Sequence, residues 1–81
     1  MPTNFVQCLA FSPDSQRLVV GNYTHIPAAP GPVYVCDVAS RKVIHSLEGH
    51  RLNVLYVAVT PDGKKIISAG DDGSVRIWEM P

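Results

Sequence analysis

The sequence lacks a surplus of charge of either sign. Seven Lys and Arg residues balance seven Asp and Glu residues, so the formal net charge is zero and the pI is about 6.8. The basic residues are also scattered along the chain. Proteins that bind nucleic acid or an anionic membrane surface normally gather basic residues into a patch. We therefore expect neither nucleic acid nor a membrane as a partner.

Cysteines and long apolar runs are scarce as well. Cys8 and Cys36 are the only two cysteines, and no Cys-x-x-Cys spacing is present. That excludes a secreted disulfide framework and a zinc or redox motif, so we expect two packed thiols. No apolar run approaches membrane-spanning length, and Met1 to Phe11 lack the pattern of a secretory leader. These features predict an intracellular, cytoplasmic protein.

A sustained helical period is also missing, and short β-type segments take its place. Apolar segments rich in Val and Ile alternate with turn residues, as in a sheet of antiparallel strands. The fold class expected is all-β, with antiparallel four-stranded meanders and about seven strands. The predicted strands are residues 6–11, 17–20, 33–36, 43–47, 54–59, 65–69 and 75–79.

The pattern repeats itself within the chain. Residues 11–14 and 17–20 precede similar residues, 59–62 and 65–68, by 48 positions, a period typical of propellers and solenoids. The interval 22–32 is six residues longer than its counterpart in the second copy and contains several prolines. Proline cannot donate a ladder hydrogen bond, so we expect 22–32 to be a loop insertion outside the sheet.

Four short motifs occur in order in the second copy. They are Gly49-His50, Thr60-Pro61-Asp62-Gly63, Asp71-Asp72-Gly73 and Ile77-Trp78-Glu79. Together they resemble a WD repeat of a β-propeller. The resemblance implies a degenerate first repeat at 1–48 and a well-formed second repeat at 49–81 that lacks its outer strand. Propellers have about four to eight blades, so we expect an incomplete propeller.

The resemblance also implies a structural tetrad in the second repeat, made of His50, Ser68, Asp72 and Trp78. The first repeat has Val20 in place of the Ser and Cys36 in place of the Trp. We therefore expect the first blade to be less stable and to depend on apolar packing. The residues expected in that packing are Phe11, Leu18, Val20, Val33, Val35 and Cys36.

The tetrad contains the residue types of a hydrolase triad, but the setting is wrong for catalysis. A nucleophilic Ser needs a strained, exposed turn and an oxyanion hole, whereas Ser68 lies within a strand pattern. His25 and His45 have no metal-ligating residue at a suitable spacing, and Asp71 and Asp72 are typical turn formers. We expect no catalytic residues, no metal, no cofactor and no enzymatic activity.

The resemblance implies that partners dock on loops at one edge of the blades. The positions concerned are Phe5, Gln7, Tyr23, His25, Asn53, Leu55 and Asp71, although Phe5 and Leu55 are also expected to pack against a neighbouring blade if they bind no partner.

The leading hypothesis is a non-catalytic protein–protein interaction scaffold that binds other proteins or peptides. The alternative is a regulatory or targeting portion of a larger enzyme or multi-subunit complex, which flanking sequence would reveal. Self-association, or further WD repeats that complete a propeller, is expected at the open 75–78 edge.

Overall fold

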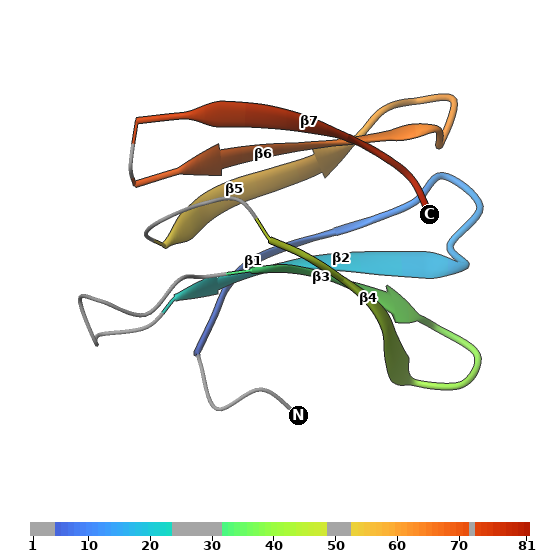
Figure 1. The fold of residues 1–81 in the computed structure, drawn as a ribbon. Coiled ribbons are helices and arrows are strands. Elements are labelled where there is room, and N and C mark those ends of the chain that lie inside the picture. The colour runs from blue at the N-terminus through green and yellow to red at the C-terminus, as the bar shows by residue number, and fades with distance from the viewer. Residues whose placement is uncertain (1–4, 24–31, 49–52, 72) are drawn as a thin grey trace.

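The computed structural model describes residues 5–23, 32–48, 53–71 and 73–81, with the side chains of Phe5 and Tyr23 excepted. These residues form seven strands in two antiparallel sheets (Figure 1). The first sheet contains β1 (Phe5–Phe11), β2 (Arg17–Tyr23), β3 (Val33–Asp37) and β4 (Lys42–Leu47). The second contains β5 (Val54–Val59), β6 (Lys65–Gly70) and β7 (Val75–Glu79).

Within each sheet, every strand pairs with its neighbour in sequence, so both sheets are meanders. This confirms the predicted all-β class. Among the residues described, no helix has the length and apolar character needed to cross a bilayer.

The second strand is longer than its apolar pattern predicts. β2 continues past Val20 to Tyr23 because Val6 and Phe5 of β1 pair with Asn22 and Tyr23 and extend the ladder. The expectation that the loop insertion begins at residue 22 is therefore wrong, since Asn22 and Tyr23 belong to a strand. The remainder of the insertion, 24–31, lies outside the described residues.

The two hairpin turns after β1 and β5 have the same internal hydrogen bonds, which confirms the repeat at atomic detail. In each turn a hydroxyl donates to a carboxylate two residues later: Ser12 Oγ to Asp14 Oδ1 at 2.5 Å and Thr60 Oγ1 to Asp62 Oδ1 at 2.6 Å. The next residue has positive φ in both turns, 60° at Ser15 and 73° at Gly63. Glycine adopts this conformation without steric cost, whereas a serine is strained there.

Cross-strand register extends the equivalence to the third strand of each sheet. Arg17 pairs with Asp37 and forms an ion pair of 2.7 Å, and Lys65 pairs with Glu79 in an ion pair of 2.6 Å. One position earlier on the third strand, Cys36 lies opposite Leu18 and Trp78 lies opposite Ile66. Cys36 therefore occupies the register position that Trp78 occupies in the second sheet.

The two sheets are stacked face to face, as Figure 1 shows, and enclose one apolar core. The fully buried residues are Val19, Val33 and Val35 from the first sheet and Val54 and Ile66 from the second. The sheets approach each other closely at Gly21, where an added Cβ would lie 2.9 Å from Val54 Cγ1 and would also collide with Cys8 Sγ. Only glycine fits this position without a shift of the Cys8 and Val54 side chains or of one sheet.

The predicted core of the first blade is partly wrong. Val33 and Val35 are buried between the sheets as expected, but Phe11 is 54% exposed. Phe11, Leu18, Val20 and Cys36 instead line the face of the first sheet that points away from the second. The physical reason is strand alternation, which places consecutive apolar residues of a strand on opposite faces.

Candidate interaction surfaces

One edge of the stack collects most of the positions predicted to contact a partner. We call it the loop edge: β1 and β5 begin there, β2 and β6 end there, and it lies opposite the two hairpin turns (left in Figure 1). The backbone N–H of Asp71 donates to the carbonyl of Asn53 over 2.8 Å. Asp71 is exposed and Asn53 half-buried, so the chain brings these two positions together at the surface.

Gln7 and Leu55 lie in equivalent β-bulges next to the loop edge. The register of the first sheet shifts between Val6 and Cys8, and that of the second shifts between Val54 and Tyr56. A bulge leaves one residue out of the regular pairing and redirects its side chain, and such residues are common next to binding sites. Gln7 is exposed and Leu55 is half-buried.

The remaining predicted contact positions are only partly described. Phe5 and Tyr23 are register partners at the end of the β1–β2 ladder, so their backbones are adjacent. Their side chains, and the whole of His25, lie outside the described residues. Whether these positions contact a partner stays a prediction.

Half of the predicted tetrad can be located. The indole Nε1 of Trp78 donates to Ser68 Oγ over 2.8 Å, and Ser68 is fully buried. A buried indole N–H needs such an acceptor. His50 and Asp72 lie outside the described residues, so their place in the network stays a prediction. Burial and the indole hydrogen bond give Ser68 the position of a packing residue, not that of an exposed nucleophile.

The ionisable groups of the described residues have structural surroundings. The Ser12 hydroxyl and the Gln16 amide hold the pKa of Asp14 below its ordinary value, and the Thr60 hydroxyl and Lys64 amide act likewise on the pKa of Asp62. Burial raises the pKa of both free thiols, Cys8 and Cys36, and so keeps them protonated at neutral pH. No group of three or more His, Cys, Asp or Glu side chains in the described part gathers as metal ligands would.

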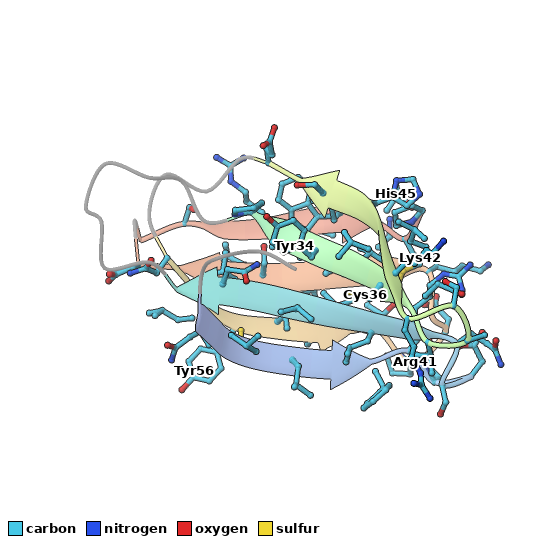
Figure 2. All side chains as sticks on the ribbon, turned by 90° about the horizontal axis from the view of Figure 1, so that it is seen from below. Tyr34, Cys36, Arg41, Lys42, His45 and Tyr56 are labelled. Atoms are coloured by element: carbon cyan, nitrogen blue, oxygen red, sulfur yellow. The ribbon has the colours of Figure 1, made fainter. Side chains whose placement is uncertain are left out.

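The sequence did not predict a groove on the outer face of the first sheet. It has a volume of about 450 Å³ and a mainly apolar lining that includes Val6, Leu9, Phe11, Leu18, Val20 and Cys36. Figure 2 looks onto this sheet from outside, with Tyr34, Cys36 and Arg41 at its surface. The groove includes Cys36, which occupies the register position of Trp78 in the second sheet. The replacement of Trp by Cys and of Ser by Val in the first repeat was the signal for it.

Asn22 is an unusual member of the groove lining. It is fully buried, and its Nδ2 donates to the carbonyl of Pro32 over 3.0 Å. Its Oδ1 is buried without a hydrogen-bond partner among the described residues. An unpaired buried acceptor of this kind costs about 1–3 kcal/mol.

The outer face of the second sheet is apolar and exposed. Four large side chains on it are exposed: Tyr56 by 72%, Val75 by 68%, Ile77 by 67% and Ile67 by 36%. Figure 2 shows the Tyr56 ring projecting beyond the β1 side of the stack. Contiguous apolar surface of this kind marks an interaction site in soluble proteins.

Known proteins and a family model are similar to this chain in sequence. The family model described as WD domain, G-beta repeat matches residues 2–25 and 41–79. The small ribosomal subunit protein RACK1y of Oryza sativa subsp. japonica is 34% identical over 80 residues, which cover 96% of this chain and 22% of that protein. The intraflagellar transport protein 122 homolog of Danio rerio is 40% identical over 70 residues, 86% of this chain and 5% of that protein.

A third relative and a solved structure extend the comparison. The target of rapamycin complex subunit wat1 of Schizosaccharomyces pombe is 31% identical over 75 residues, which cover 93% of this chain and 22% of that protein. The Cps50 (Swd1) β-propeller domain of Myceliophteria thermophila, a crystal structure, superposes with a TM-score of 0.83 at 22% identity, over 98% of this chain and 22% of that one. The chain thus spans less than a quarter of the length of each of these proteins.

Proposed function

Because this chain belongs to the WD40 family of WD-domain G-beta repeats, we propose that it is a non-catalytic protein-interaction scaffold that presents its loop edge to another protein or peptide. Its domain organisation in this proposal is a degenerate repeat at 1–48 followed by a regular repeat at 49–81. The proposal includes an intracellular, cytoplasmic location. It assigns no catalytic role to Ser68, which is buried.

The observation that carries the proposal is the arrangement at the loop edge. Two bulges place Gln7 and Leu55 at equivalent positions, and the Asp71–Asn53 hydrogen bond holds a third and fourth position beside them. These positions lie on hydrogen-bonded strands and not on a long loop, so little conformational entropy is lost when a partner binds. The edge offers an amide, a carboxylate and an apolar side chain, which suits a peptide with both polar and apolar contacts.

A role within a larger complex is a second candidate. It is favoured by relatives whose names describe a ribosomal subunit protein and a subunit of a target of rapamycin complex. In that case the loop edge would contact another subunit, and the chain would act as a regulatory or targeting portion. Both candidates predict a protein ligand at the same edge.

The test is binding of selected peptides to matched variants. Peptides are selected from a displayed library against the 81-residue chain, and their affinities are measured by fluorescence polarisation. Gln7→Ala and Asp71→Ala are expected to weaken binding at least about 5-fold each, the size of one lost polar contact. Gln16→Ala and Lys64→Ala, exposed residues of the hairpin turns at the opposite edge, are the controls and should bind as the wild type does. Equal affinities in all four variants would refute the loop edge as the binding surface.

A further inference from the structure

The first sheet ends at β4, and the far side of this strand has no neighbouring strand in the part of the chain that the structure describes. We call this side the β4 edge. Every residue of β4 except Leu47 is exposed. Figure 2 shows Lys42 and His45 along this strand, at one side of the molecule. An open strand edge presents unpaired backbone N–H and C=O groups, which can pair with a strand of another chain.

The β4 edge stays open whatever covers the faces of the two sheets. Within this chain the sheets pack face to face around one core. Further sheets stacked in the same way would cover the outer faces and would leave the β4 edge at the side of the stack. The edge is therefore available in a longer stack, in contrast to the groove of the first sheet.

Charges of opposite sign mark the two ends of the β4 edge. Arg41 and Lys42 are exposed at the start of the strand, and Glu48 is exposed directly after its end. Neither ion pair of the described residues includes any of these three. Asp37, the register partner of Lys42, is already bound to Arg17. The edge therefore offers unpaired positive charge at one end and unpaired negative charge at the other.

An edge with this order of charges is complementary to a second copy of itself in the antiparallel direction. Lys42 lies three residues before His45, and Glu48 lies three residues after it. A two-fold axis near His45 thus places the basic start of each strand opposite Glu48 of the other copy, whereas parallel pairing would place like charges together. The same arrangement brings the exposed Val43 opposite Leu47 of the other copy, so apolar surface is buried as well.

We propose that the chain forms a two-fold symmetric dimer in which the β4 strands of two copies pair antiparallel and join the two first sheets into one. A bulge at Ile44, which has no register partner on β3, interrupts the strand and shortens the contact. Because a short strand contact buries little area, the dimer is weak, with a dissociation constant in the micromolar range or above. The contact is independent of the loop edge and of both outer sheet faces.

Charge reversal at each end of the edge tests this arrangement. Sedimentation equilibrium of the 81-residue chain is measured at low ionic strength, where exposed charges are least screened. Lys42→Glu and Glu48→Lys each place like charges opposite one another, so each should raise the dissociation constant at least about 5-fold. An equimolar mixture of the two variants restores opposite charges at both ends and should dimerise about as tightly as the wild type. Arg76→Glu, which reverses an exposed charge on β7, is the control and should change nothing.

Three results would overturn the proposal. The first is a wild-type chain that stays monomeric up to about 1 mM, since the contact would then lie beyond the range of specific association. The second is a mixture that dimerises no better than either variant alone, because complementary ends predict recovery. The third is weaker association in Arg76→Glu but not in Lys42→Glu, which would assign the contact to the β7 edge.

The position of the two-fold axis has a separate readout. His45→Cys places two thiols close together across the axis, so mild oxidation should link two 8.8 kDa chains into a covalent dimer. Lys64→Cys, an exposed position in a hairpin turn, is the matched control, and the wild type measures any linkage through Cys8 or Cys36. Equal yields of covalent dimer from the two variants would indicate random collision and would contradict an axis near His45.

Discussion

At the scale of single residues, the two sheets differ at the positions of the hydrogen-bonded pair Ser68 and Trp78. The second sheet has the Trp78–Ser68 hydrogen bond of 2.8 Å, and the first has Cys36 and Val20 at the same register positions. On the second sheet this face packs against the first sheet, whereas on the first sheet the same face carries the groove.

Ser68→Ala should destabilise the chain by about 1–3 kcal/mol, because it removes the acceptor of the half-buried Trp78 indole. Urea unfolding followed by the fluorescence of Trp78, the only Trp in the chain, measures the change. Ser46→Ala is the matched control, since Ser46 is exposed on β4 and its loss should cost less than about 0.5 kcal/mol. Equal effects of the two substitutions would show that the indole hydrogen bond contributes nothing.

Sequence reasoning located the Ser68–Trp78 pair but not the groove. The pair was predicted because each member of the tetrad occupies a fixed position in a WD repeat. The groove depends on which face of β2 each apolar residue occupies and on the orphan acceptor of Asn22, a residue that the sequence assigned to a loop. A β ladder that continues through Asn22 and Tyr23 depends on pairing with β1, and this long-range contact leaves no local signal.

At the scale of elements, the hairpin turns are the part that the sequence predicts best. Pro-Asp turn chemistry set the ends of β1 and β5, and the predicted bounds of β5 and β7 are those of the structure. Both turns hold their Asp by a hydroxyl and a backbone amide, even though one has Ser15 and the other Gly63 at positive φ. Local hydrogen bonds of this kind need no tertiary context, which is why the pattern alone was sufficient.

These turns predict a loss of stability in acid. The folded-state pKa of Asp14 and of Asp62 is lowered from 3.8, first by the neighbouring hydroxyl. The stabilisation is therefore present above the unfolded value and is lost as the pH falls through the lower, folded value. The urea midpoint should drop between about pH 5 and pH 2, and the double variant Asp14→Asn, Asp62→Asn should show a smaller drop. Gln16→Ala, which removes no carboxylate, should keep the full drop; a double variant that behaves like it would contradict the assignment.

At the scale of the whole molecule, the two sheets share one core and cannot be considered separately. Val54 and Ile66 of the second sheet are buried against Val19, Val33 and Val35 of the first. Sequence reasoning gave the number of strands and their order, but it placed the core of the first blade inside that blade. The packing between the sheets depends on close approach at Gly21, whose importance is visible only once both sheets are in place.

Gly21→Ala should destabilise both sheets together. The new Cβ would lie 2.9 Å from Val54 Cγ1, so the sheets must separate or Cys8 and Val54 must move, at a cost of about 1–3 kcal/mol. Trp78 lies in the second sheet, and its fluorescence should nevertheless report the lower urea midpoint, in step with circular dichroism of the whole chain.

Ala69→Gly, the counterpart on the exposed outer side of the second sheet, lacks an opposing sheet and should not loosen the core contact. All measurements use one protein concentration, because association would raise the apparent stability. A Trp78 transition unmoved by Gly21→Ala would mean that the sheets unfold independently and that the shared core does not couple them.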